Sequence, residues 1–93
     1  MTTTVFDAEL TATNQTISGV ENTQFMVFVG GSGIAATNVT VAVKPPNGLD
    51  YFYDVYVFSD EDAQTIQVPK GSDIRFTIAD ASSGVNVECH PMV

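Results

Sequence analysis

Short runs of alternating apolar and polar residues constrain the fold of this chain more than any other feature of its sequence. Across residues 73–79, Ile74, Phe76 and Ile78 fall on one side of an extended chain, with polar residues between them. Residues 37–43 repeat the pattern with three valines spaced two residues apart. Helical periodicity is absent, and β-branched residues dominate the apolar runs. The sequence therefore predicts an all-β protein.

Turn signals divide the chain into about seven such segments. Prolines cannot continue a β-ladder and Asn-Gly favours a tight turn, so Pro45-Pro46-Asn47-Gly48 ends one strand. Residues 11–23 are interpreted as a loop with a turn near Ser18-Gly19. The expected strands are residues 2–10, 24–29, 37–43, 51–58, 63–68, 73–79 and 85–89.

Short strands at this spacing are typical of an antiparallel β-sandwich, and a small β-barrel is the alternative. A chain of 93 residues has room for one domain, so we expect residues 1–93 to form a single sandwich with an N-terminal arm. Inward-facing positions of the expected strands predict the core, which comprises Val27, Val39, Val41, Val55, Ile66, Ile74, Phe76, Ile78, Val85 and Val87.

Two of the expected strands are apolar on both faces. Residues 25–29 form a continuous apolar run, and residues 51–58 place aromatic side chains on each side of the strand. So small a chain cannot cover both faces of both strands, so we expect a homo-oligomer, with a trimer as the favoured form. Asp54 lies within the second run, so it either pairs with Arg75 or marks an exposed face.

Composition excludes several classes of function. The chain has 11 acidic and 3 basic residues and a net charge of −8, which argues against nucleic acid as a partner. A single cysteine excludes a disulfide framework and a zinc finger. We expect no secretory leader and no membrane partner, because no apolar run is long enough. Eleven threonines and only two lysines suit permanent packing against neighbours, or a threonine-rich domain that is simply acidic.

No group of residues indicates catalysis. Cys89 and His90 are adjacent in a strand, so their side chains point to opposite faces, and Cys89 is expected in the core. The acidic run Asp60-Glu61-Asp62 is interpreted as a solvated turn, with a calcium site as the alternative. Gly30-Gly31-Ser32-Gly33 follows a strand, but no helix with Lys-Ser or Lys-Thr follows it, which argues against a phosphate-binding loop. We expect neither enzymatic activity nor a cofactor.

The chain resembles the small β-sandwich proteins of tailed-bacteriophage virions, in particular capsid decoration or cement proteins. The features that carry the resemblance are the chain's size, its Met-Thr-Thr-Thr start, its threonine-rich strands and the segment from Ile66 to Ile78. The resemblance implies a protein that binds the major capsid protein at local symmetry axes, often as a trimer, and clamps adjacent capsomers. The alternatives are a head- or tail-fibre component and an immunoglobulin-like adhesion or carbohydrate-binding module, in which exposed tyrosines would stack on sugars.

The decoration hypothesis predicts where the protein lies and which residues it uses. It would be made in the host cytoplasm and would lie on the outer capsid surface, since its negative charge would repel a packaged genome. Exposed aromatic residues and an ordered N-terminal arm would anchor it. The candidate partner-binding residues are Thr2, Thr3, Thr4, Val5, Phe6, Tyr51 and Tyr53.

Overall fold

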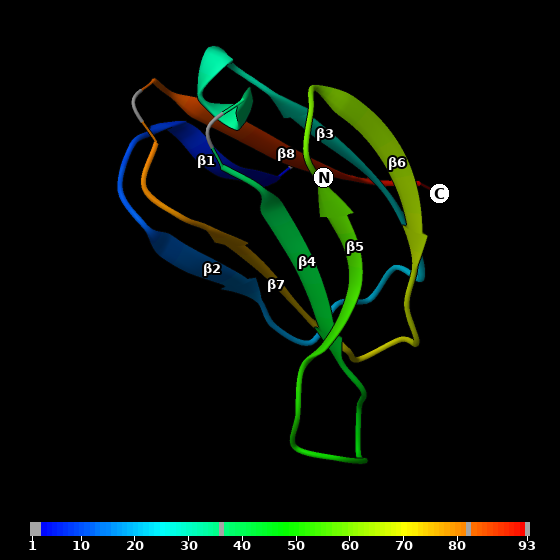
Figure 1. Ribbon diagram of the computed structural model, residues 1–93. Coiled ribbons are helices and arrows are strands. Elements are labelled where there is room, and N and C mark those ends of the chain that lie inside the picture. Colours follow the sequence, from blue (N-terminus) through cyan, green and yellow to red (C-terminus); the bar gives the residue numbers. More distant parts are fainter. Residues whose placement is uncertain (1–2, 36, 82, 93) are drawn as a thin grey trace.

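Two four-stranded antiparallel sheets pack face to face and contain most of the chain (Figure 1). The computed structural model describes residues 3–35, 37–81 and 83–92, and within them it has eight strands and one short 3₁₀ helix, Ser32–Ala35. The strands are β1 (Thr3–Glu9), β2 (Thr13–Ile17), β3 (Gln24–Gly30), β4 (Val39–Lys44), β5 (Tyr53–Phe58), β6 (Asp62–Gln67), β7 (Asp73–Ile78) and β8 (Val85–Pro91). The predicted all-β antiparallel sandwich is confirmed.

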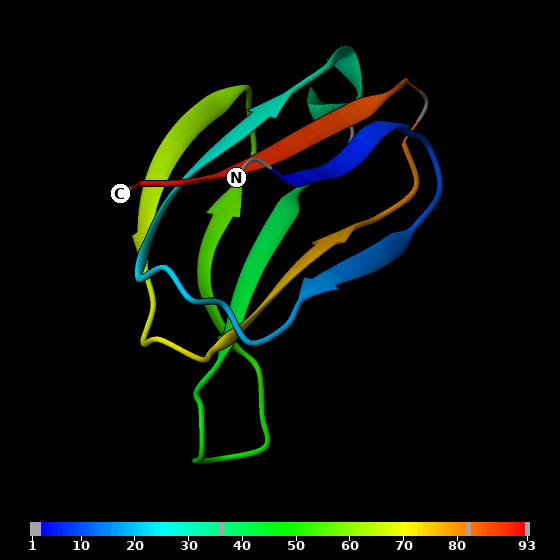
Figure 2. The same ribbon diagram turned by 180° about the vertical axis from the view of Figure 1, so that it is seen from behind.

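The order of the strands is that of a jelly roll. One sheet has the order β1-β8-β3-β6 and the other has the order β2-β7-β4-β5, and the chain changes sheet at every connection except the β4–β5 hairpin. Eight strands wound in this way form a double-sheet jelly roll. The winding leaves β5 and β6 along one open side of the sandwich and β1 and β2 along the other, as Figures 1 and 2 show.

Strand β2 corrects the interpretation of residues 11–23 as a loop. Its five residues, TNQTI, pair with β7 from Thr13 opposite Ile78 to Ile17 opposite Ile74. The side chains of β2 are exposed or half-buried, because β2 is an edge strand that contributes little to the core. Apolar alternation, which marks half-buried strands, is therefore missing from its sequence.

The strand predicted over residues 2–10 is confirmed as β1 from Thr3 onward, so residues 3–6 belong to the sandwich and do not form an N-terminal arm. Strand β1 pairs antiparallel with β8, with Thr3 opposite Cys89 and Phe6 opposite Val87. Phe6 is 3% exposed and belongs to the core, so it is not the exposed anchor that the sequence suggested. Thr3 and Thr4 are exposed, and Thr2 lies outside the described residues.

The space between the sheets holds the predicted core with one exception. Nine of the ten predicted core residues are buried. Phe76 and Val41, at the centre of the β2-β7-β4-β5 sheet, are completely buried. Val55 is the exception, because half of its surface is exposed.

A β-bulge in β5 explains the error at Val55. Tyr56 lies opposite Val41 and Asp54 lies opposite Ala42, so Val55 is an extra residue without a partner on β4. The extra residue reverses the inward and outward positions on either side of it. Tyr53, Tyr56 and Phe58 consequently share the inner face, whereas simple alternation would separate Tyr53 from the other two.

Substitutions at Phe76 and Val55 test this assignment of core and surface. Phe76→Ala is expected to lower the free energy of unfolding by about 3–5 kcal/mol, because it leaves a cavity in the centre of the core. Val55→Ala is expected to change it by less than about 1 kcal/mol, because the side chain is half exposed. Urea unfolding of both variants measures these changes, and equal costs would show that the bulge is misplaced.

Candidate interaction surface

Residues 45–52 form a loop that extends beyond the end of both sheets (Figures 1 and 2). Two prolines end β4 because they cannot donate to the ladder, and Asn47 takes the left-handed conformation at the turn, with φ 52°. Leu49 and Tyr51 are the most exposed large apolar residues of the described chain, and we call them the loop tip. The Tyr51 ring packs edge-to-face on Tyr53, with the ring centroids 4.9 Å apart.

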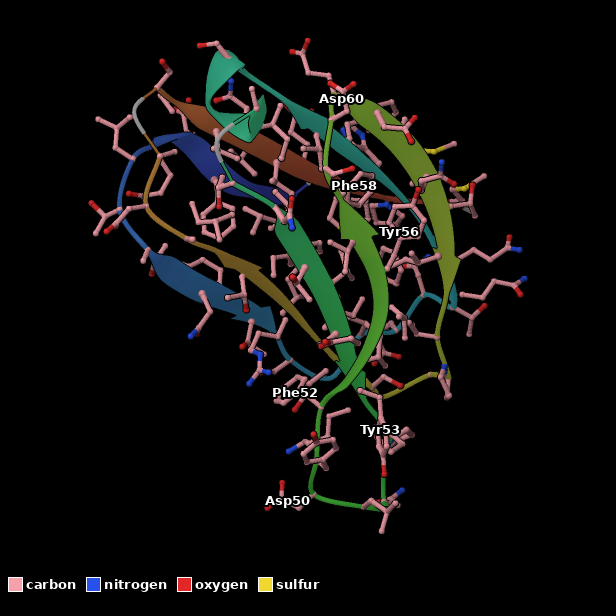
Figure 3. The ribbon with its side chains drawn as sticks, viewed as in Figure 1. Asp50, Phe52, Tyr53, Tyr56, Phe58 and Asp60 are labelled. Carbon is pink, nitrogen blue, oxygen red and sulfur yellow. The ribbon has the colours of Figure 1, made fainter. Side chains whose placement is uncertain are left out.

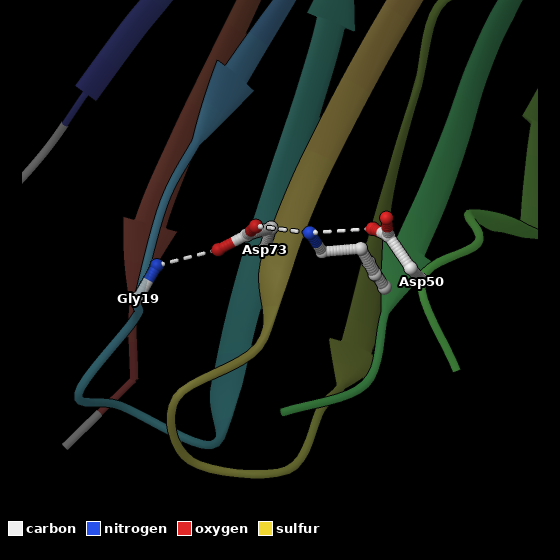
Figure 4. A network of polar contacts seen from close by, with 4 residues as sticks. Gly19, Asp50 and Asp73 are labelled. Carbon is white, nitrogen blue, oxygen red and sulfur yellow. Dashed lines mark hydrogen bonds and ion pairs between the residues drawn. The ribbon is translucent and has the colours of Figure 1, made fainter. Parts of the chain in front are cut away.

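A polar network ties the base of this loop to two other segments (Figure 4). The Nζ atom of Lys44 lies 3.2 Å from Asp50 Oδ1 and 3.5 Å from Asp73 Oδ2. Asp73 also accepts a hydrogen bond of 2.8 Å from the Gly19 amide in the β2–β3 loop. The hydrogen bond to Asp50, together with the charges of both carboxylates, raises the pKa of Lys44. The loop therefore leaves the sandwich at an anchored base.

Phe52 makes a second anchor on the outer face of the β2-β7-β4-β5 sheet. The Arg75 guanidinium stacks over the Phe52 ring at 4.3 Å from the centroid, and Lys44 Nζ lies 5.9 Å from the same centroid. Both contacts are cation–π interactions. In Figure 3, Phe52 and Tyr53 lie on opposite sides of the chain as it enters β5.

Asp54 and Arg75 are brought near one another without forming an ion pair. Both lie opposite Ala42, on the strands that flank β4. No ion pair joins them in the structure, in which both residues are described, and Asp54 is exposed. The alternative that Asp54 marks an exposed face is therefore confirmed. Arg75 stacks on Phe52 instead, and its buried Nε atom has no hydrogen-bond partner.

The exposed apolar residues of β5 continue this surface along the edge of the sheet. They are Tyr53, Val55, Tyr56 and Val57, which are 44%, 50%, 36% and 47% exposed, and we call them the β5 edge surface. Strand β5 ends its sheet, so one side of its main chain has no strand beside it. Figure 3 shows Tyr53 and Tyr56 along this strand. The loop tip and the β5 edge surface together form the candidate site.

Strand β3, the other strand that was expected to be apolar on both faces, exposes less apolar surface than β5. In β3, Phe25, Val27 and Val29 are buried in the core, whereas Met26 is half-buried and Phe28 is exposed on the outer face. Strand β3 is paired with β8 on one side and with β6 on the other, so neither side of its main chain is open to a further strand.

Cys89 and His90 do not form a catalytic pair. Cys89 lies in the core, as predicted, and burial raises its pKa to about 11. The His90 Nε2 atom lies 2.9 Å from Glu88 Oε1 on the outer face, and its ring packs edge-to-face on Phe28. A buried, protonated thiol is a poor nucleophile.

The acidic run is a solvated turn, as predicted, and its carboxylates engage separate groups. Asp60 accepts a hydrogen bond from the Glu61 amide, and Glu61 accepts one from the Gly31 amide at 3.0 Å. Asp62 accepts from Gln64 and from the Ala63 amide, and these bonds lower the pKa of Asp62. Among the described residues, no three His, Cys, Asp or Glu side chains are grouped so as to hold a metal ion.

The glycine-rich segment has a packing role that its sequence did not reveal. It enters the 3₁₀ helix Ser32–Ala35, and the Gly33 amide donates a 3.1 Å hydrogen bond to the Gly84 carbonyl. A Cβ atom at Gly33 would collide with the carbonyl oxygen of Ser83, and one at Gly31 would collide with that of Gly84. These glycines therefore allow the β3–β4 connection to pack against the β7–β8 turn.

In the part of the chain that the structure describes, no helix has both the length and the apolar character needed to cross a membrane. Comparison of the chain with protein-family models, with curated proteins and with solved structures finds no match.

Gly33→Ala tests the packing role of the glycine-rich segment. The added methyl group is expected to lower the free energy of unfolding by about 1–3 kcal/mol, because backbone must move to make room for it. Gly48→Ala is the matched control, since a Cβ atom there would meet its neighbours at ordinary contact distances of 3.6 Å and more. Thermal unfolding followed by circular dichroism compares the two variants, and equal stability would contradict the close contact.

The raised pKa of Cys89 predicts a pH dependence of reactivity and of stability. At pH 8 only about one thiol in a thousand is ionised in the folded protein, so alkylation is expected to require unfolding. Above pH 9 the unfolded thiol ionises while the folded thiol stays protonated, so the free energy of unfolding falls as the pH rises toward 11. The decline should be smaller in Cys89→Ala, and an identical decline would contradict the assignment.

Proposed function

We propose that this protein is a non-enzymatic structural component of a virion, which decorates the outer surface of the capsid and stabilises it. The observation that carries the proposal is the apolar surface formed by the loop tip and the β5 edge surface. A domain with a complete core has no internal need to expose six large apolar side chains in one region. Exposed apolar side chains gathered on one loop and along one edge strand are typical of sites of protein interaction.

The anchored loop base supports a binding role for the loop tip. Lys44 holds the base through Asp50 and Asp73, and next to Lys44 the Phe52 ring is held against Arg75. A loop whose conformation is set before binding loses less entropy when it docks. Leu49 and Tyr51 are therefore well suited to enter a pocket on the major capsid protein.

The distribution of charge supports a protein surface as the partner in place of nucleic acid. All three basic side chains lie in the described part of the chain, and each has a partner within it. Lys44 contacts Asp50 and Asp73, Lys70 lies 3.6 Å from Glu21, and Arg75 stacks on Phe52. No cluster of basic residues remains to neutralise phosphates.

The jelly-roll topology is compatible with this role but does not decide it. Viral coat proteins, lectins and cupins share the topology, so the fold alone assigns no function.

The proposal retains Tyr51 and Tyr53 as partner-binding residues and adds Leu49, whereas Phe6 is excluded by its burial. Thr3, Thr4 and Val5 belong to β1, so deleting them would remove part of a sheet and would not test binding alone.

Binding to undecorated shells of the virus whose genome encodes this chain tests the proposal. The wild-type protein is expected to cosediment with these shells and to raise the temperature at which they disassemble. The double substitution Leu49→Ser and Tyr51→Ser is expected to abolish both effects. Leu10→Ser is the matched control, because Leu10 is a similarly exposed leucine in the β1–β2 connection. Failure of the wild-type protein to bind the shells would refute the decoration role.

A carbohydrate-binding role is the second candidate, and the Tyr51–Tyr53 pair favours it. Two exposed tyrosine rings in edge-to-face contact resemble the aromatic groups on which lectin-like domains stack sugar rings. Retention on immobilised polysaccharides that is lost in Tyr51→Ala would support this role over shell binding.

A further inference from the structure

We infer that β5 of one copy of this protein pairs antiparallel with β5 of a second copy. The two β2-β7-β4-β5 sheets then continue into one eight-stranded sheet across a twofold axis. Pairing of exposed strand edges uses main-chain hydrogen bonds for affinity and alternate side chains for specificity. The inference rests on the proposed assembly role, and it names the surface through which copies of the chain join.

The first argument is the contrast between β5 and the other three edge strands. Strand β2 (TNQTI) and strand β6 (DAQTIQ) carry mainly polar side chains, and β1 is interrupted by two register shifts. Strand β5 (YDVYVF) has no lysine or proline and carries one charge, Asp54. Edges that must stay unpaired are usually protected by charges, prolines or bulges. The bulge at Val55 is the only such device that interrupts pairing on β5, and it turns Val55 outward beside Val57.

The second argument is the orientation that the charges allow. The acidic turn Asp60-Glu61-Asp62 follows one end of β5 and enters β6, and the loop of residues 45–52, which contains Asp50, precedes the other end. Parallel pairing would set the acidic turns of the two copies side by side. Antiparallel pairing separates them by the length of the strand, about 20 Å for six residues, which exceeds the Debye length at physiological salt.

The third argument is the area that the pairing would bury. The four side chains of the β5 edge surface expose about 260 Å² in each copy, taking about 200 Å² for a whole tyrosine side chain and about half of that for valine. The unpaired main chain adds about six hydrogen bonds to this area. The two copies together would bury about 500 Å² of side-chain surface, which is less than the ~1,200 Å² at which stable specific interfaces begin. We therefore expect a reversible dimer that strengthens when several copies are held on one shell.

The pairing is isologous, so it closes at two copies. The same strand is used on both sides of a twofold axis, and no free β5 edge remains after pairing. The inference thus departs from the trimer expected from the sequence. It assigns the β5 edge surface, Tyr53 included, to contact between copies of the chain, which leaves Leu49 and Tyr51 for the shell. The loop tip of each copy remains available for a different partner.

Sedimentation velocity and amide hydrogen exchange, measured together across a range of protein concentrations, test the inference. The mass is expected to rise from 9.9 kDa to twice that value between micromolar and near-millimolar protein. Protection of the β5 amides should rise in step with the mass, while the β2 amides stay unchanged. Val57→Lys is expected to keep the protein monomeric and to leave its circular dichroism unchanged. Gln15→Lys, which adds the same charge to the exposed β2 edge, is expected to dimerise like the wild type.

Four results would overturn the inference. They are a monomer at all concentrations, a trimer, a dimer whose β5 amides gain no protection, and a Val57→Lys variant that still dimerises. Protection of β5 that arises only on adding shells would instead assign this strand to the capsid protein. The outcome is separable from the proposed function. A dimer that binds no shell supports the pairing and refutes decoration. A monomer that protects shells supports decoration and refutes the pairing.

Discussion

Two sheets of this size can bury only the side chains that lie between them, and the pairing of β5 with β4 decides which aromatic side chains those are. The bulge at Val55 sends Tyr53, Tyr56 and Phe58 toward the inner face, where Phe58 completes the core. Tyr53 and Tyr56 remain partly exposed because β5 is the last strand of its sheet and only β4 flanks it. The exposed aromatic surface is thus a consequence of the strand order together with one extra residue.

Alternation predicted the strands and the core well wherever one face of a strand is buried on a regular ladder. It placed Ile74, Phe76 and Ile78 correctly because β7 lies in the interior of its sheet and pairs without interruption with β2 and β4. It failed at Val55 because the bulge there has no glycine or other local signal in the sequence. It also missed β2, whose polar residues pair with β7 but contribute little to the core.

The candidate surface was predictable only in part. The excess of apolar residues over 51–58 indicated that some would stay exposed, and Tyr51 and Tyr53 do so. The anchors of the loop were not predictable, because Lys44 meets Asp73 and Phe52 meets Arg75 across more than 20 residues of sequence. Such contacts depend on the pairing of β4 with β7, which the order of strands along the chain does not reveal. The same limit applies to the N-terminal residues. Their sequence predicts a strand over residues 2–10, but it does not reveal the pairing with β8 at the other end of the chain, which places them in the sheet.

The net charge of −8 gives the exposed β5 edge a physical role in restricting association. Most surfaces of two approaching copies repel one another, because acidic side chains are spread over the loops, the acidic turn and the outer faces of the strands. Strand β5 carries one charge, Asp54, so repulsion is weakest where apolar contacts are richest. A neutral protein with this edge could aggregate through several surfaces. With the charge in place, the proposed pairing would be favoured at this one edge, and it would end growth at two copies. The acidic composition and the apolar strand would then act together to give a discrete assembly.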